Sequence, residues 1–198
     1  MIFFKSKKPE SSEAGEKSQD NIDLQIINKM NQEFAISLDL NETLQTALEL
    51  IIARLNAQAA NIFLINEKKK KFECIASLHQ EYLEDYELDL KDGVMGRAVD
   101  LRKCIRVGDV RKDVRDIAEF YFDLDNKTNF TTFSVLCAPL IAANDCIGVI
   151  HCLNKKTNDK LFIEDDRKLL ELLSTPAALA IRNAKMAKDM IEQNKIQK

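Results

Sequence analysis

The stretch LNKKTNDKLFIEDDRKLLELL, residues 153–173, holds the end of an apolar strand, a polar turn and the start of a long helix. Asn154 and Lys155 close the strand, six residues separate Lys155 from Phe162, and three more separate Phe162 from Asp166. This spacing lets Lys155 reach back across the turn, so we expect an ion pair with Asp166 that clasps strand and helix together. Because an exposed pair contributes at most about 1 kcal/mol, we expect the clasp to act by positioning its neighbours.

Downstream of the turn, the sequence predicts one helix over 163–193, longer than a domain of this size needs. Pro176 lies inside it and removes one backbone hydrogen bond, so we expect a kink near Ser174. We expect residues 169–173 to pack on the protein's own sheet. Beyond the proline, a four-three spacing is typical of a helix that pairs with another subunit. The residues with this spacing are Ala180, Asn183, Ala187 and Met190.

Upstream of the turn, the sequence predicts a sheet. Two apolar runs, 133–141 and 146–153, predict neighbouring strands at its centre, buried on both faces. A hairpin with strands over 61–66 and 72–77 precedes them, and its turn includes four consecutive lysines that we expect to be solvated. A further short strand is predicted over 104–107.

Helices and one long crossover complete the pattern. A helix with a single apolar face is predicted over 39–57, capped by Asp39 or Asn41. A short helix is predicted over 94–101, after a glycine. Residues 109–130 show no clean periodicity, so we expect an irregular crossover with at most short helices, and crossovers of this length usually carry function.

The chain divides into four parts. Residues 1–20 are polar and are expected to form a disordered leader, and residues 21–38 are expected to form a connecting helix. A single globular domain is predicted over 39–188, with its last helix projecting to about residue 193 and a tail over 194–198. A chain of 198 residues with 45% apolar content fits one core of this kind.

Composition excludes several classes of function. A net charge of -3 provides no basic field for nucleic acid, and no apolar run approaches the roughly 18 residues of a membrane span. We therefore expect a cytoplasmic protein without nucleic-acid or membrane partners. There is no phosphate-cradling glycine loop and no cluster of metal ligands, so we expect a regulatory module with no catalytic residues and no metal. The five cysteines are odd in number and scattered, as in a protein with reduced, buried thiols.

Five ordered blocks of sequence resemble the GAF domain, a small-molecule sensor module found in phosphodiesterases, adenylyl cyclases, phytochromes and many bacterial regulators. The blocks are GVMGRAV at 93–99, IRVGDV at 105–110, SVLCAPL at 134–140, IGVI at 147–150 and the stretch from Asn154 to Asp166. The resemblance covers about residues 40–188. It implies an α+β, GAF-like three-layer sandwich, with a central antiparallel sheet, flanking helices and long terminal helices.

The clasp resembles the motif of those GAF domains that bind cyclic nucleotides. Its residues are Asn154, Lys155, Phe162 and Asp166, and in such domains the lysine and aspartate support the ligand pocket without touching the ligand. Arg167 stands where the motif has glutamate, so the motif is incomplete. The resemblance implies cAMP or cGMP as the ligand, without a covalently bound cofactor.

Residues 121–132 resemble the lid segment of these domains. Thr128 and Thr132, four residues apart, can present both hydroxyls to one cyclic phosphate. Tyr121 can stack on a purine or meet its edge, and Asp125 can accept a hydrogen bond from a base or ribose group. Asn129 replaces the usual glycine, and asparagine tolerates a left-handed backbone well.

The resemblance also implies a floor for the pocket. Val94 and Met95 would supply backbone N–H groups near the phosphate at a helix start. Asn61 and Cys74 lie where related domains place groups that contact the base. His151 occupies a position where a phosphodiesterase-type domain carries glutamate, and because a neutral histidine can contact base or phosphate, the base preference stays open.

Two other classes of function compete with a cyclic-nucleotide sensor. One is a ligand-free GAF dimerisation or adaptor module. The other is a redox or tetrapyrrole sensor, suggested by the adjacent His151 and Cys152, by His79 as a second candidate haem ligand, and by free thiols at Cys104, Cys137 and Cys146. Convergent polar groups in the lid would favour the sensor over the adaptor.

In the expected mechanism, residues 113–132 form a lid that closes over the sheet when the ligand binds. Such closure shifts the balance between two arrangements of the terminal helices if the ligand binds them with different affinities. We expect a homodimer formed through the N- and C-terminal helices, which would pass the change to an output domain or a partner protein.

Overall fold

The computed structural model describes residues 39–80, 87–91, 93–113 and 118–196, together with residues 24, 25, 28, 29 and 32. The expected leader over 1–20 lies outside the described residues. So does most of the expected connecting helix over 21–38.

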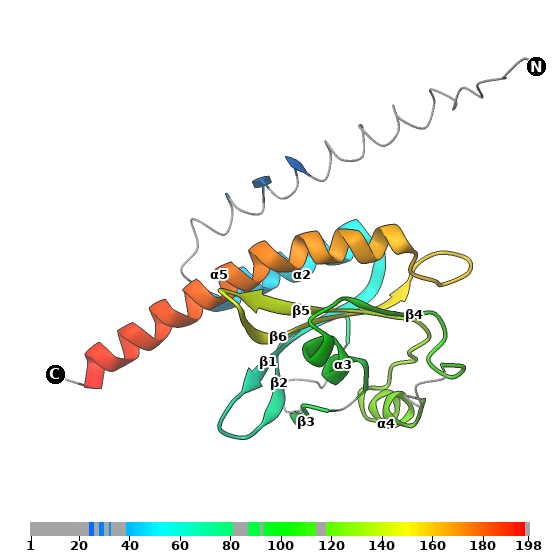
Figure 1. Ribbon diagram of the computed structural model, residues 1–198, viewed down its shortest axis with the longest axis horizontal. Coiled ribbons are helices and arrows are strands. Elements are labelled where there is room, and N and C mark those ends of the chain that lie inside the picture. The colour runs from blue at the N-terminus through cyan, green and yellow to red at the C-terminus, as the bar shows by residue number, and fades with distance from the viewer. Residues whose placement is uncertain are drawn as a thin grey trace, which may run out of the picture.

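A six-stranded sheet forms the middle of the domain, in the order β3-β2-β1-β6-β5-β4 (Figure 1). All neighbouring strands in this order are antiparallel. The strands are β1 (Ala57–Asn66), β2 (Lys71–Leu78), β3 (Glu87–Asp89), β4 (Ile105–Val107), β5 (Val135–Ala142) and β6 (Asp145–Lys155). The prediction of two buried strands near the centre is confirmed, since β5 and β6 are buried over most of their length.

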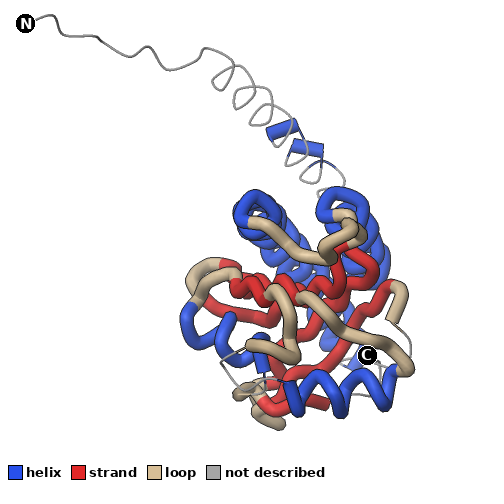
Figure 2. Tube along the Cα trace, turned by 90° about the vertical axis from the view of Figure 1, so that its right-hand side faces the viewer, coloured by secondary structure: helices blue, strands red, loops and turns tan. Residues whose placement is uncertain are grey.

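Helices cover both faces of this sheet, which confirms the predicted three-layer α+β sandwich. Helices α2 (Leu40–Leu55) and α5 (Glu164–Ile196) lie side by side on one face, and α3 (Gly93–Leu101) and α4 (Ala118–Thr128) lie on the other (Figures 1 and 2). Each face has its own hydrophobic core. The first joins the sheet to α2 and α5, and the second joins it to α3 and α4.

Capping residues fix the ends of α2. The side chain of Asp39 accepts a hydrogen bond of 3.0 Å from the backbone N–H of Glu42, so Asp39, of the two candidates, is the N-cap. Asn56 ends the helix in a left-handed conformation with φ of 49°. The helix therefore stops before Ala57, where the first strand begins.

The two central strands approach each other closely at Gly148. A β-carbon at this position would lie 2.1 Å from the backbone oxygen of Phe63, a separation that no side chain can adopt. Glycine at 148 thus allows β1 and β6 to pair, and this pairing sets the geometry of the sheet on which the site lies.

The structure corrects the prediction for the crossover. Residues 109–130 were expected to hold at most short helices, but they include α4, a helix of 11 residues. Its inward residues Tyr121, Leu124, Asp125 and Thr128 follow helical spacing, yet two of these four are polar, which hides the pattern from a search for apolar periodicity. Strand β3, of three residues, was also not predicted.

Helix α5 is one continuous element from Glu164 to Ile196, and Pro176 lies inside it without ending it. Its first half packs on the sheet and on α2, as expected for residues 169–173, where Leu170 and Leu173 are fully buried. Its C-terminal half projects beyond the sheet (Figure 1). Among the helices in the described part of the chain, none combines the length and apolar character needed to cross a bilayer.

Candidate functional site

A row of side chains crosses the middle of the sheet on the face that α3 and α4 cover. The strand register pairs Ser77 with Asn61, Asn61 with His151, and His151 with Cys137. Alternation along β6 assigns His151 to this face, because its second neighbours Val149 and Leu153 belong to the α3–α4 core. Asn61 and His151 have no exposed surface. Polar groups are thus enclosed within an otherwise apolar core.

The side chain of His151, on β6, contacts that of Tyr121, on α4. Its Nε2 lies 2.9 Å from the tyrosine hydroxyl, and the two rings stack with centroids 5.8 Å apart. Burial lowers the pKa of His151 to about 3, so the imidazole is neutral at physiological pH. Its Nδ1 has no hydrogen-bond partner among the described residues. Leaving a buried polar atom without a partner costs about 1–3 kcal/mol, so Nδ1 is a candidate contact for a ligand group.

A second set of polar contacts links the sheet to the end of α4. Asn61 Nδ2 donates to Gln80 Oε1 at 2.7 Å, and Gln80 Nε2 donates to Thr128 Oγ1 at 3.2 Å. Thr128 in turn donates to the backbone oxygen of Leu124, and Ser77 donates to Asn61 Oδ1. Sequence reasoning missed Gln80 and Ser77, since isolated polar residues at a strand end give no periodic signal.

Asp125 fixes the turn that follows α4. Its two carboxylate oxygens accept from the hydroxyl of Thr132 at 2.6 Å and from the backbone N–H of Thr132 at 2.7 Å. Asn129 adopts the left-handed conformation expected for it, with φ of 48°. The lid residues are buried, but their expected arrangement requires a correction. Thr132 lies beyond the end of α4, so helical spacing does not align its hydroxyl with that of Thr128, and the two hydroxyls bond to different partners.

The start of α3 lies on the same face. Val94 and Met95 are fully buried in the α3–α4 core, and Gly93 before them has φ of 55°. Their backbone N–H groups belong to the first turn of a helix, which favours anions. Cys74 is buried in this core beside Phe72, on the β2 side.

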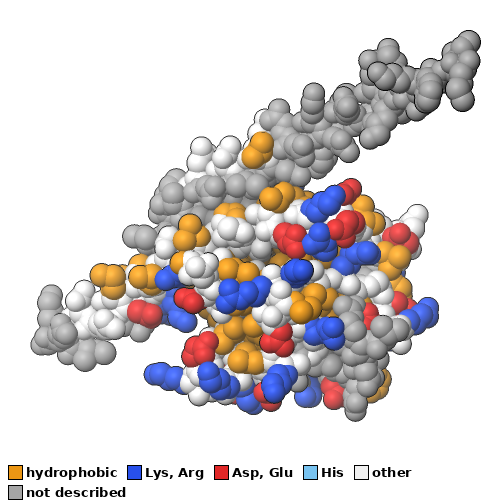
Figure 3. Space-filling view, in the orientation of Figure 1, with side chains coloured by type: hydrophobic (Ala, Val, Ile, Leu, Met, Phe, Trp, Pro, Cys, Tyr) orange, Lys and Arg blue, Asp and Glu red, His pale blue; other side chains and the backbone are white. Residues whose placement is uncertain are grey.

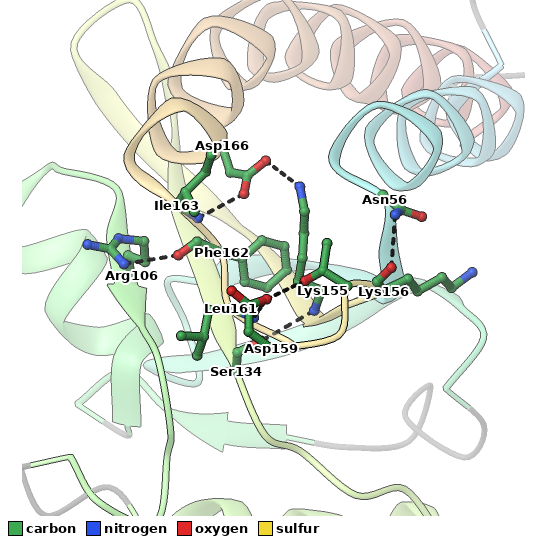
Figure 4. A network of polar contacts seen from close by, with 11 residues as sticks. Asn56, Arg106, Ser134, Lys155, Lys156, Asp159, Leu161, Phe162, Ile163 and Asp166 are labelled. Atoms are coloured by element: carbon green, nitrogen blue, oxygen red, sulfur yellow. Dashed lines mark hydrogen bonds and ion pairs between the residues drawn. The ribbon is translucent and has the colours of Figure 1, made fainter.

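The clasp joins β6 to α5 (Figure 4). Lys155 Nζ lies 2.5 Å from Asp166 Oδ1, and both side chains are largely buried. Asp166 Oδ2 also accepts from the backbone N–H of Ile163 at 2.8 Å, which caps the first turn of the helix. Phe162 is fully buried in the α2–α5 core. Arg167 pairs with Glu164 and Glu171, so this departure from the motif leaves the ion pair intact.

Asn154 secures the segment between α4 and β5. Its Oδ1 accepts from the backbone N–H groups of Phe133 and Ser134, at 2.7 and 3.2 Å. Its Nδ2 donates to the backbone oxygen of Thr131 and to Gln58 Oε1, at 2.7 and 2.9 Å. Its backbone is left-handed, with φ of 54°. Asn154 thus binds the segment that follows α4, whereas its neighbour Lys155 binds the start of α5.

The geometry gives little support to tetrapyrrole or redox chemistry. His151 and Cys152 are adjacent, but Cys152 belongs to the α2–α5 core, on the opposite face of the sheet from His151. All five cysteines are free. Burial raises the pKa of Cys104 to about 12 and raises the pKa of Cys137 and Cys152 well above the ordinary value, so these thiols are poor nucleophiles. Within the part of the chain that the structure describes, no three metal-binding side chains cluster.

Comparison with known proteins identifies the family of the fold. The sequence profile of the GAF domain matches residues 37–182. A probable 3′,5′-cyclic phosphodiesterase of Caenorhabditis elegans is 25% identical over 142 residues, which are 66% of this chain and 19% of the relative. The dual 3′,5′-cyclic-AMP and -GMP phosphodiesterase 11A of Takifugu rubripes is 30% identical over 95 residues, or 48% of this chain and 10% of the relative.

Solved structures share the architecture. The GAF domain of a phosphoenolpyruvate-protein phosphotransferase from Coxiella burnetii superimposes with a TM-score of 0.69 at 16% identity, covering 84% of this chain and 96% of that domain. The chain spans less than a fifth of the length of the two phosphodiesterases, so it corresponds to one portion of such proteins. Since the profile covers well over half of the sequence, this chain belongs to the GAF domain family, whose members are generally regulatory sensor domains.

Proposed function

We propose that this GAF domain binds a cyclic nucleotide between the sheet and α4. The observation that carries the proposal is the enclosed polar cluster formed by Asn61, His151, Tyr121, Gln80 and Thr128 within an apolar core. A core that only had to be stable would bury hydrocarbon here, because buried polar groups need partners. The similarity to two cyclic-nucleotide phosphodiesterases supports this ligand class.

The ligand has an expected orientation. The polar side chains named above are uncharged, so a phosphate is best placed at the first turn of α3, where the N–H groups of Val94 and Met95 and the helix dipole favour an anion. The base then lies toward His151. Its neutral imidazole can donate or accept at Nδ1 according to tautomer, which suits a purine edge.

Helix α4 acts as the lid. Tyr121 and Leu124 are buried against the sheet, and Thr128 is tied to it through Gln80. Movement of α4 is passed to the Asp125–Thr132 contact, and from there to the segment held by Asn154. Because Lys155 follows Asn154 and pairs with the start of α5, occupancy can be transmitted to the C-terminal helix.

A ligand-free adaptor remains the second candidate, and one observation favours it. Asn61, Thr128 and Asp125 already bond to protein groups, so their contacts are satisfied without a guest. In that case the polar cluster only fixes α4 on the sheet.

A binding experiment separates the two candidates. Titration calorimetry of cAMP, cGMP and cyclic dinucleotides, with thermal unfolding in parallel, should show one saturable ligand. At a hundred times its dissociation constant this ligand adds about 2.7 kcal/mol to the free energy of unfolding. Thr128→Val should weaken binding. Thr131→Val, at an exposed residue four positions before β5 begins, serves as the matched control. Absence of binding by all three ligand types would favour the adaptor.

The role of His151 can be tested atom by atom. Glutamine places its amide near the position of Nε2, so His151→Gln keeps a partner for Tyr121 and loses the Nδ1 contact. Asparagine places its amide near Nδ1, so His151→Asn does the reverse. We expect about tenfold weaker binding in His151→Gln and partial retention in His151→Asn. Equal affinity in both variants and in the wild type would place the base elsewhere.

A further inference from the structure

Gln80 is a buried polar residue that follows the end of β2. The strand ends at Leu78, and His79 then adopts a left-handed conformation with φ of 65°. Such a backbone is uncommon in residues other than glycine. His79 is exposed, whereas Gln80 is only 3% exposed. The chain thus turns at His79 so that the side chain of Gln80 lies inside the domain.

The side-chain amide of Gln80 joins the sheet to α4. Its Oε1 accepts from Asn61 Nδ2 at 2.7 Å, its Nε2 donates to Thr128 Oγ1 at 3.2 Å, and both bonds are buried. The hydroxyl of Ser77 donates to the backbone oxygen of Gln80 and so holds the main chain in place. One carboxamide therefore acts as acceptor toward β1 and as donor toward α4.

A purine base offers the same pair of functions. The Watson–Crick edge of adenine or guanine places a donor beside an acceptor, as a carboxamide does. A base that bound Asn61 and Thr128 would need the place that the Gln80 amide fills. Asn61 also pairs in register with His151, whose Nδ1 has no partner among the described residues. The site thus combines two polar groups that Gln80 satisfies with one that it does not.

We propose that the amide of Gln80 is an internal competitor of the ligand, which fills the place of the base and must leave before the base binds. The inference rests on the proposed function, because it concerns the same site. It also accounts for the observation that favours an adaptor, since Asn61 and Thr128 become available once the amide moves. The apparent dissociation constant is then the intrinsic constant divided by the fraction of molecules in which the amide is displaced.

The exterior of the domain provides little control of affinity. On the face shown in Figure 3, basic and acidic side chains are intermixed, so they create no uniform field that attracts an anion. Affinity is then set by the buried contacts. Because Gln80 belongs to the same chain, its amide competes at a high effective concentration.

Removal of the amide should tighten binding. For Gln80→Ala, calorimetric titration with cAMP and cGMP should give about tenfold tighter binding than the wild type, because two buried hydrogen bonds no longer compete. Gln80→Asn keeps an amide that is one methylene too short to bridge Asn61 and Thr128, so we expect a smaller gain. Gln45→Ala is the matched control, since Gln45 is exposed and bonds to Glu49 within α2. This control should bind as the wild type does.

Acetamide tests the vacated place without a nucleotide. It is the part of glutamine that alanine lacks, so it should bind Gln80→Ala in the millimolar range, as measured by saturation-transfer NMR. The wild type and Gln45→Ala should not bind it. Acetamide should also weaken the binding of the nucleotide to Gln80→Ala.

The sign of the change in affinity decides the inference. Weaker or unchanged binding by a folded Gln80→Ala overturns it and leaves the proposed function in place, because Gln80 is then a ligand contact or has no role in binding. Binding by Gln80→Ala but not by the wild type supports it in its strongest form. If neither variant at position 80 folds in thermal unfolding, Gln80 is a structural residue and the inference is overturned.

Failure of the proposed function gives a different result. In that case no chain binds either nucleotide. Binding of acetamide to Gln80→Ala would then still support a separable amide at this place, and absence of acetamide binding would overturn the inference as well.

Discussion

Asn154 and Lys155 are adjacent in the chain, yet their side chains hold two different parts of the domain. Asn154 bonds to Thr131, Phe133 and Ser134, which follow α4, whereas Lys155 pairs with Asp166 at the start of α5. The lid and the projecting helix are thus anchored at consecutive positions of one central strand. This relationship makes the separate contributions of the two residues measurable.

Replacement of Asn154 should loosen the lid segment. Asn154→Ala removes four side-chain hydrogen bonds and leaves alanine in a left-handed conformation, so we expect a loss of about 3 kcal/mol in urea unfolding. Asn129→Ala is the matched control, because Asn129 has nearly the same backbone conformation, with φ of 48°, but is exposed. If the two variants lose equal stability, the side-chain bonds of Asn154 contribute nothing.

The clasp should behave as a partly buried ion pair. Asp166→Asn keeps an oxygen for the N–H of Ile163 and removes the charge that Lys155 faces. A double-mutant cycle with Lys155→Met should therefore give a coupling of about 2 kcal/mol that changes little in 1 M salt. The exposed pair of Lys168 and Asp165 provides the comparison, and we expect no measurable coupling there. A clasp coupling that vanishes in salt would indicate a solvated pair.

Burial of His151 should make the fold sensitive to acid. Because the folded-state pKa is about 3 and the unfolded value is about 6.5, the unfolded chain binds a proton more readily below pH 6.5. Above pH 6.5 the titration of His151 therefore leaves the free energy of unfolding unchanged. As the pH drops from 6.5 toward 3, the free energy of unfolding decreases, by about 2 to 3 kcal/mol at pH 4.5. Cys137, across the strand pair, has a raised pKa and stays neutral throughout.

Urea unfolding between pH 4.5 and 7.5 measures this effect. His151→Phe should flatten the dependence on pH over that range, whatever its effect on absolute stability. A variant with the same slope as the wild type would show that other groups cause the acid sensitivity.

The thiols should differ in reactivity according to burial. We expect Cys146, which is half buried, to be alkylated first, and Cys137 and Cys152, which are fully buried, to react only on unfolding. Mass spectrometry of iodoacetamide-treated protein resolves the order, and Cys146→Ser should remove the fast phase. Rapid native-state labelling of Cys104 or Cys152 would instead revive a redox role.

Sequence reasoning recovered the fold because its signals are local and strong. The apolar runs of β5 and β6, the cap at Asp39 and the turn before Asp166 each specify an element without tertiary information. Helix α4 was missed because half of its inward residues are polar. The partners of those residues were missed as well, since the contact of Gln80 with Thr128, 48 positions away, depends on how the crossover folds back over the sheet.

The way α4 is attached has a consequence for how a guest enters. Among the described side chains of α4, Tyr121, Leu124 and Thr128 connect the helix to the sheet. Detachment of α4 leaves the strand ladders whole, so we expect the helix to open as a separate cooperative unit at a free energy well below that of global unfolding. Amide hydrogen exchange should then be faster in α4 than in β6. The domain can thus open locally at α4 while the sheet and the other helices stay folded.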